Sequence, residues 1–182
     1  MRAQMADISV FEKVLARRAG PARWADRAFW VIATYRLGRR IIAIRSEWRR
    51  RLLLTLFLPF ARLVETICRM SMPVFAEIGE GLRISSCGMI FIHSNVRIGR
   101  NCRLSRGVTI GNAREGGPTP IVGDNVEIGA YAQILGGVRI GDGAKIASMS
   151  VVLKDVPIGA VAAGIPAKVR AGAQASVWGS MI

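Results

Sequence analysis

From Met72 onward the chain places an aliphatic side chain at every sixth position, and few folds are compatible with that spacing. The spacing resumes after one eight-residue step and after one longer interruption, GNAREGGPTPIV. It gives the series Met72, Ile78, Ile84, Ile92, Ile98, Leu104, Ile110, Val122, Ile128, Ile134, Ile140, Ile146 and Val152. A small or β-branched residue often stands two positions earlier, at Val96, Cys102, Val108, Val126, Ala132, Val138, Ala144 and Ser150. Glycine often follows directly, at Gly79, Gly99, Gly111, Gly123, Gly129 and Gly141.

A period of six does not fit a helix, but it is a multiple of the strand period of two, so positions two and six apart face the same way. Short strands that meet at corners, with the aliphatic series inside, predict a β-solenoid whose successive coils share one core. The glycines supply the corners, where positive φ or tight packing is required. Ordinary alternating strands of a sandwich would not need this fixed spacing.

Residues 1–70 have a helical pattern instead. Gly20-Pro21 breaks the chain, and Phe29, Ile32 and Leu37 then follow near helical spacing. We expect a second helix over Glu47–Leu58 and a third from Pro59 to about Met70. The predicted organisation is a helical region at 1–71, a β-helix at 72–170 and a tail at 171–182.

The charge and the cysteine content indicate which binding sites and which cellular compartment to expect. The net charge is +14, and the first 70 residues hold fourteen Arg and one Lys against five acidic residues. The three cysteines are scattered and form no Cys/His cluster, so neither a zinc site nor a disulfide framework is predicted. We expect a cytoplasmic protein, because no signal peptide is visible and the longest apolar run, Leu52–Phe60, is too short to span a bilayer.

The basic helical region has two interpretations. Trp24, Trp30 and Trp48 alternate with arginine-rich runs, which suits peripheral binding to an anionic membrane at its inner face. Alternatively, the aromatic side chains pack the helices together and the arginines are simply exposed. No nucleic-acid-binding motif is present, so nucleic acid is not an expected partner. In either case the helices would cover the open edge of the first coil.

The segment IGDGAKIASMSVVLKDVPIGAVAAGIPAKV resembles the last coil and tail of the hexapeptide-repeat acyltransferases, and the resemblance covers roughly residues 72–170. FWVIATYRLGRR and VETICRMSMPVFAEIGEGLRI resemble the helical lead-in of serine O-acetyltransferases and of their shorter relatives in exopolysaccharide and capsule synthesis. The resemblance implies a mainly β fold, a left-handed parallel β-helix preceded by an α-helical segment. It also implies a homotrimer with sites between neighbouring prisms, acetyl-CoA as cosubstrate, no metal, and a hydroxyl-bearing acceptor.

The family's catalytic motif falls on ISSCGMIFIHSNVRIG with its histidine base at Ser86. The acidic partner falls at Ser71 and a second histidine at Thr119, while His93 matches a later His/Asn position that is not the base. Serine is neutral near pH 7 and accepts a proton poorly, so Ser86 cannot simply replace an imidazole. His93 is either an outward corner side chain or a relocated base, and we take His93 and Ser86 as the candidate catalytic residues.

The resemblance also implies positions for CoA along one edge of the prism. Small side chains there would let the pantetheine arm lie close, and lysines would meet its phosphates. The matching residues are Gly111, Asn112, Ala130, Ser148 and Lys154, with Lys168 as a further candidate. The loop Asn112–Thr119 is expected to project beside the acceptor site. Cys87 is expected to be a packed or loop cysteine, and Cys102 a core residue.

The resemblance therefore predicts an acetyl-CoA-dependent O-acetyltransferase whose acceptor is serine or a sugar in exopolysaccharide biosynthesis. The alternative is a catalytically impaired relative that serves as a CoA-binding or scaffold subunit. That alternative is motivated by the replacements at Ser71, Ser86 and Thr119.

Overall fold

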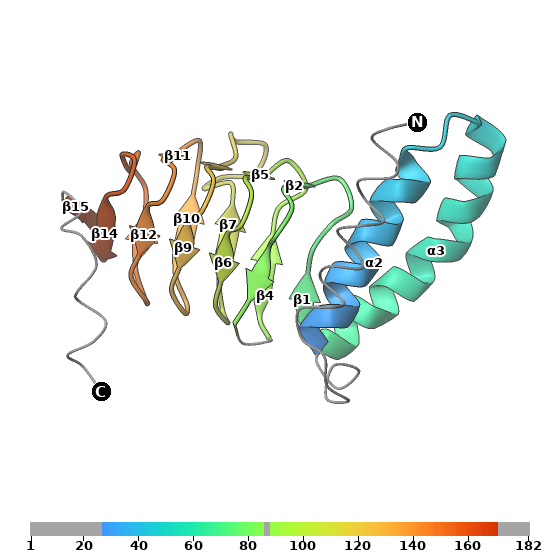
Figure 1. Cartoon of the computed structure of the whole chain (residues 1–182), viewed down its shortest axis with the longest axis horizontal. Helices are drawn as coiled ribbons and strands as arrows, with labels where there is room; N and C mark the ends of the chain where they lie inside the picture. The colour runs from blue at the N-terminus through green and yellow to red at the C-terminus, as the bar shows by residue number, and fades with distance from the viewer. Residues whose placement is uncertain (1–26, 86–87, 171–182) are drawn as a thin grey trace.

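A computed structural model describes residues 27–85 and 88–170. Two helices, α2 (Arg27–Ile42) and α3 (Glu47–Cys68), lie side by side across one end of a long column of short strands (Figure 1). The column is a left-handed parallel β-helix, as predicted. None of the helices in the described part of the chain is long and apolar enough to cross a membrane.

The strands form three sheets, one on each side of the column. Sheet A contains β1 (Met70–Ser71), β4 (Ile90–Ile92), β7 (Thr109–Gly111), β10 (Gln133–Leu135) and β13 (Val151–Val152). Sheet B contains β2 (Glu77–Ile78), β5 (Arg97–Ile98), β8 (Ile121–Val122) and β11 (Arg139–Ile140). Sheet C contains β3 (Arg83–Ile84), β6 (Arg103–Leu104), β9 (Glu127–Ile128), β12 (Lys145–Ile146), β14 (Val161–Gly164) and the antiparallel β15 (Ala167–Arg170).

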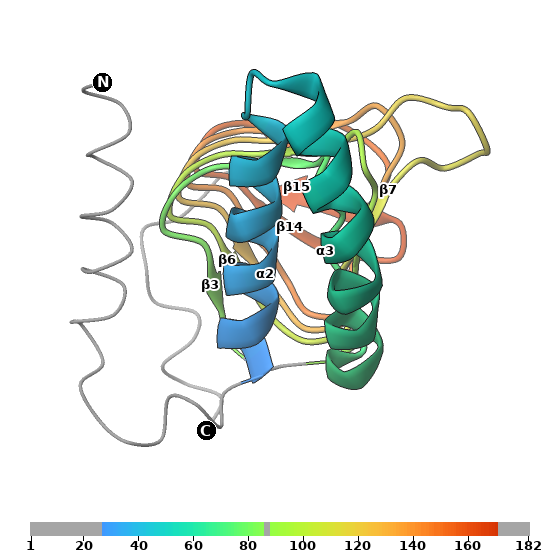
Figure 2. The same ribbon diagram turned by 90° about the vertical axis from the view of Figure 1, so that its right-hand side faces the viewer.

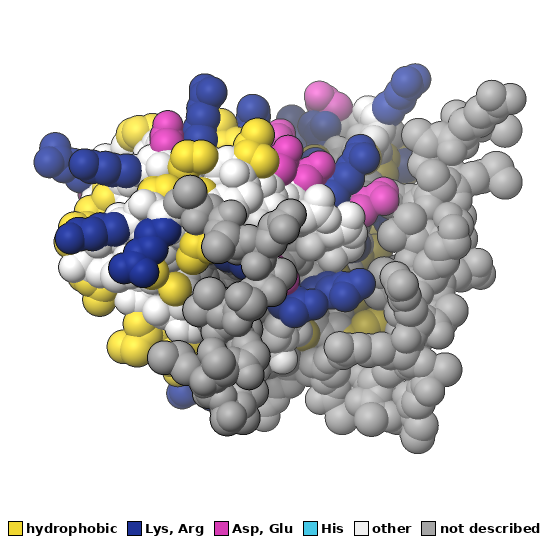
Figure 3. Space-filling model, turned by 60° about the vertical axis from the view of Figure 1, so that its left-hand side comes forward, with side chains coloured by type: hydrophobic (Ala, Val, Ile, Leu, Met, Phe, Trp, Pro, Cys, Tyr) yellow, Lys and Arg dark blue, Asp and Glu magenta, His cyan; other side chains and the backbone are white. Residues whose placement is uncertain are grey.

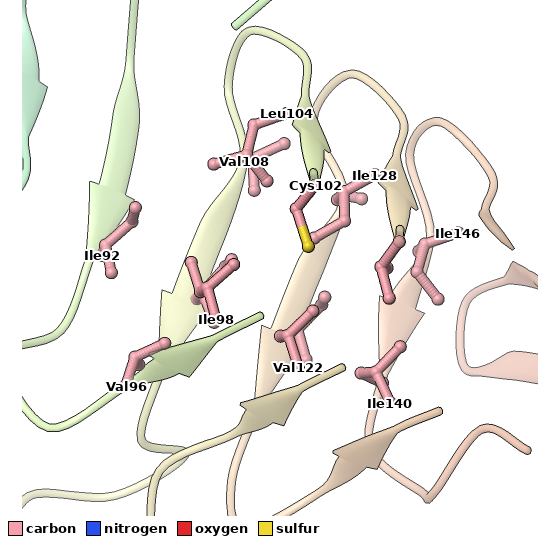
Figure 4. Close-up of a cluster of buried hydrophobic side chains, with 14 of the residues drawn as sticks. Ile92, Val96, Ile98, Cys102, Leu104, Val108, Val122, Ile128, Ile140 and Ile146 are labelled. Carbon is pink, nitrogen blue, oxygen red and sulfur yellow. The ribbon is translucent and has the colours of Figure 1, made fainter. Parts of the chain in front are cut away.

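The six-residue series lines the interior, as predicted. Ile98, Leu104 and Ile110 are at most 3% exposed, and the smaller residues two positions earlier are buried with them (Figure 4). Ile98 pairs in register with Val122 one coil on, and Leu104 pairs with Ile128. Ile84 is the half-buried exception. Stacking of like side chains between coils thus forms one continuous core.

The corner glycines act through close packing and not through positive φ. A Cβ on Gly79 would lie 2.6 Å from the Gly99 backbone, and one on Gly129 would lie 2.5 Å from the Ser148 nitrogen. The left-handed conformation falls two residues later in the corners between sheets B and C, at Asn101 (φ 55°), Asn125 (φ 57°) and Gly143 (φ 65°). Asparagine tolerates this conformation, so these corners need no glycine there.

Two described cysteines are buried. Cys102 belongs to the core, as predicted, and its Sγ lies 3.1 Å from the Gly123 carbonyl oxygen. Burial raises the pKa of its thiol. Cys68 closes the end of α3 and is also buried. The prediction for Cys87 lies outside the described residues.

The prediction of separate helices on either side of Pro59 is wrong, because α3 runs continuously from Glu47 to Cys68 with Pro59 inside it. Proline removes one helical hydrogen bond. The helix nevertheless keeps one continuous buried face, on which Phe57, Ala61 and Cys68 lie. Burial of this face on both sides of the proline offsets the lost bond.

The helices cover the first coil, as expected. The hydroxyl of buried Tyr35 donates to the Ala76 carbonyl (2.6 Å) and accepts the Ile78 N–H (3.1 Å). The Arg36 guanidinium donates to the carbonyl oxygens of Ile78 (3.0 Å) and Gly79. Backbone groups at the open edge of the column therefore find their partners in α2.

We expect Tyr35→Phe to lower the free energy of unfolding by about 1–3 kcal/mol, because it leaves a buried carbonyl and a buried N–H without their partner. Tyr131→Phe is the matched control, since Tyr131 is 45% exposed on a corner. Chemical denaturation of both variants measures the difference. Equal stability of the two variants would contradict the role assigned to Tyr35.

We expect Gly99→Ala to destabilise the column by about 1–3 kcal/mol through overpacking. Its Cβ would lie 2.5 Å from the Gly123 carbonyl oxygen on the next coil. Gly143→Asn should be tolerated, because Asn101 and Asn125 already occupy the equivalent corner position with positive φ. Thermal denaturation followed by circular dichroism compares the two, and the reverse order would refute the close-packing argument.

Candidate functional site

His93 lies directly after β4, at the corner where sheet A turns into sheet B. Its backbone N–H donates to the Ile110 carbonyl (2.9 Å), and its carbonyl accepts the Val96 N–H (3.1 Å), which closes a turn. The Asn95 N–H donates to the His93 Nδ1 (3.2 Å). The ring is therefore held against its own turn and is only partly exposed.

This hydrogen bond determines which ring nitrogen of the neutral imidazole carries the proton. When Nδ1 accepts, the neutral imidazole carries its proton on Nε2. In this arrangement Nε2 carries an N–H, so it can act only as a donor. A base role for His93 requires the ring to leave the Asn95 N–H.

Both ends of the loop between β7 and β8, residues 112–120, lie against the turn that begins at His93. At its start, a Cβ on Gly111 would lie 3.4 Å from the His93 Cβ. At its end, the Thr119 hydroxyl donates to the Asn95 carbonyl (2.9 Å). We call His93, Asn95, Gly111 and Thr119 the loop-base cluster. The loop itself projects away from the column, as predicted (Figure 2).

The coil above supports the loop through a glycine pair. A Cβ on Gly136 would lie 3.6 Å from the Ala113 Cβ, and one on Gly137 only 2.9 Å from the Pro118 Cβ. The Gly136 N–H also donates to the Gly111 carbonyl (2.9 Å). Sequence reasoning missed Asn95 and this pair, although adjacent glycines are a departure from the six-residue pattern that could have indicated a close approach.

Lys154 lies on the same edge of sheet A as the loop-base cluster. It follows β13, whose Val152 pairs with Ile134 of β10, and β10 in turn pairs with β7. Its side chain is exposed. This edge of sheet A therefore carries four of the predicted residues: His93, Gly111, Asn112 and Lys154.

Ala130 and Ser148 lie on the opposite edge of sheet A, in corners that precede β10 and β13. The Ala130 carbonyl accepts the Met149 N–H (2.8 Å), so the two corners stack directly on one another. Ser86 lies outside the described residues, between Ser85 and Gly88 on the way into β4. Ser71 is half-buried in β1, on sheet A beside Phe91.

The width of sheet A thus separates the predicted residues into two groups within one chain. One edge carries the His93 ring, the projecting loop and Lys154. The other edge carries the small corner side chains of Ala130 and Ser148. A shallow hollow of about 460 Å³ lies elsewhere, on sheet B, lined by residues that include Ile121, Arg139 and Ile158. It contains none of the predicted site residues, and nothing in its chemistry points to catalysis.

The family pattern described as the bacterial transferase hexapeptide (six repeats) matches residues 119–154. This range runs from the end of the loop to Lys154, through the coils that carry Ala130 and Ser148. Residues 119–154 of the column therefore carry the hexapeptide repeats of bacterial transferases. A comparison with curated protein sequences gives no match.

Solved structures similar to this hexapeptide-repeat chain are serine acetyltransferases. One is a complex with CoA, at 30% identity over 80% of this chain and 57% of that chain, with a TM-score of 0.69. Another, from Neisseria gonorrhoeae and in complex with serine, has 32% identity over 78% and 56% of the two chains and a TM-score of 0.67. The soybean apoenzyme has 30% identity over 85% and 64%, with a TM-score of 0.71. The chain therefore spans less than two thirds of the length of each.

The substitution His93→Asn tests the structural role of the ring. We expect the free energy of unfolding to stay within about 0.5 kcal/mol of the wild type, because an asparagine oxygen can accept the N–H two residues on. His93→Ala should cost about 0.5–1.5 kcal/mol through the lost acceptor. Urea denaturation of the pair measures this difference, and an asparagine variant no more stable than the alanine variant would contradict it.

Proposed function

We propose that the protein is an acetyl-CoA-dependent O-acetyltransferase. The hydroxyl oxygen of the acceptor forms a bond to the acetyl carbon, the carbon–sulfur bond of the thioester breaks, and the hydroxyl proton ends on the CoA sulfur. The observation that carries the proposal is the likeness, at 30% identity over 80% of this chain, to a serine acetyltransferase solved with CoA.

CoA would lie along the edges of sheet A. The small side chains at Gly111, Ala130 and Ser148 leave room for the pantetheine arm. Exposed Lys154 would meet a phosphate as a point charge. Asn112, at the start of the projecting loop, would contact the arm as it passes.

A second copy of the chain would bring the two groups of residues together. Within one chain sheet A lies between the loop-base cluster and the Ala130–Ser148 corners, whereas between two neighbouring prisms one edge of each could face the other. This separation supports a homotrimer, in which cyclic symmetry generates three equivalent composite sites.

The acceptor we propose is serine or a sugar hydroxyl in exopolysaccharide biosynthesis, acetylated in the cytoplasm. Serine is favoured by the similar enzyme of Neisseria gonorrhoeae, which was solved in complex with serine. The sugar is favoured by the resemblance of the helical lead-in to the relatives in exopolysaccharide and capsule synthesis. His93 and Ser86 remain the proposed catalytic residues, and a base role for His93 would need its ring to release the Asn95 N–H.

A CoA-binding or scaffold subunit without turnover is the second candidate. The loop-base cluster favours it, because the Thr119 hydroxyl and the His93 Nδ1 are both hydrogen-bonded to the backbone of Asn95. Neither group is then available to remove a proton from an acceptor.

We expect CoA to bind the full chain. Ser148→Trp should weaken that binding about tenfold, roughly 1.4 kcal/mol, because the indole would fill the space proposed for the pantetheine arm beside Ala130. Lys154→Ala should weaken it by a smaller factor, up to about fivefold, because an exposed charge contributes little. Lys145→Ala is the matched control, since Lys145 lies on sheet C and pairs with Glu127 (3.7 Å). Calorimetric titration with CoA measures all three.

The same samples separate the two candidate functions. Release of the CoA thiol from acetyl-CoA, with serine and then with a panel of nucleotide sugars, would establish the transferase and its acceptor. CoA binding without thiol release for any acceptor would establish the scaffold. Absence of CoA binding, or equal weakening by Lys145→Ala, would overturn the proposed position of CoA along the edges of sheet A.

A further inference from the structure

The outer face of α3 is apolar and has no partner within the described residues. Trp48, Leu52, Leu56, Leu63 and Ile67 follow one another at intervals that keep them on one side of the helix, and each is 55–68% exposed. We call these five residues the outer stripe. Leu53 and Phe60, 40% and 49% exposed, widen it.

The outer stripe points away from the column. The helix pair lies across the end of the column (Figures 1 and 2). Phe57, Ala61 and Cys68 occupy the buried side of α3, so the exposed stripe belongs to the end surface. Burial of the opposite face holds the helix in place without any contribution from the stripe.

Arginines border the stripe. Arg51 and Arg62, with side chains 81% and 80% exposed, lie along one side of it. The hydroxyls of Thr55 and Thr66 donate to backbone carbonyls of their own helix (2.9 and 2.8 Å). At the start of the helix the Arg49 guanidinium lies 5.2 Å from the centre of the Trp48 ring.

The acidic residues of the helices offset only a small part of this charge. Residues 27–69 contain ten arginines and two glutamates. Glu47 pairs with Arg50 and Arg51, each at 3.9 Å, and Glu65 pairs with Arg62 (3.6 Å) while it also accepts the Met72 N–H (3.1 Å). The end surface is therefore apolar with a cationic border.

We propose that the outer stripe binds an anionic membrane surface, with α3 lying in the plane of the interface. An apolar face of Trp, Leu and Phe beside arginines is the composition of interfacial helices, and arginine stems can lie along the apolar region while their charges reach lipid phosphates. A second copy is the less suitable occupant, because two such surfaces would repel each other. Residues 1–26 are themselves net basic and offer no complementary charge.

Co-sedimentation of the full chain with vesicles tests this proposal. We expect binding to phosphatidylcholine vesicles that contain phosphatidylserine, much weaker binding to phosphatidylcholine alone, and a decrease as salt rises. Leu56→Asp should reduce binding about tenfold, since it places a charge in the middle of the stripe.

Ile158→Asp is the matched control. Ile158 is 77% exposed at the opposite end of the column, where apolar and basic side chains also lie side by side on the surface (Figure 3). This variant should bind vesicles like the wild type.

Three results would overturn the proposal. They are no binding to anionic vesicles at low salt, equal loss in both variants, or a change of oligomeric mass in Leu56→Asp with vesicle binding intact. The last result would assign the stripe to a second copy. CoA binding is measured on the same samples and does not depend on α3, so failure of the membrane proposal leaves the transferase proposal standing.

Discussion

Successive coils of the column approach one another to within backbone contact at their corners, and the rest of the structure depends on that approach. Gly79, Gly99 and Gly129 leave no room for a side chain against the next coil. The close contact lets N–H groups such as those of Arg103 and Glu127 reach carbonyls one coil on, at 2.9 and 3.0 Å. It also brings the inward aliphatic side chains into stacks. Backbone hydrogen bonds and apolar burial therefore reinforce the same geometry.

Carboxylates extend this ladder at the corners. Asp124 accepts the Arg100 N–H (2.7 Å), and Asp142 accepts the Asp124 N–H (2.8 Å). These corners lie at the surface, yet their backbone donors are satisfied from within the chain. Hydrogen bonds therefore connect successive coils at the corners as well as between the strands. Corner side chains such as His93 project from a backbone that these bonds hold in place.

The period of six was enough to predict which side chains face inward, because inward positions recur only when every coil repeats the same sides. Residues such as Ile98 and Cys102 follow directly from it. The period could not reveal which corner residue adopts positive φ, since both glycine and asparagine can do so and the glycines had a different task. It also could not predict that α3 continues through Pro59, because tertiary burial of Phe57 and Ala61 overrides a local helix breaker.

The candidate site was predictable residue by residue but not in its arrangement. Gly111 and Ala130 look similar along the sequence, since they follow an aliphatic position by one and two residues, yet they occupy opposite edges of sheet A. The loop after Gly111 leaves this order of the sheets unchanged. Ile98 and Val122 pair in register although the loop lies between them, and Val122 and Ile140 pair in the same way without one. The number of residues at this corner can therefore differ without changing the register of successive coils. New recognition surfaces can be grafted at this corner, or removed from it, while the scaffold beneath remains unaltered.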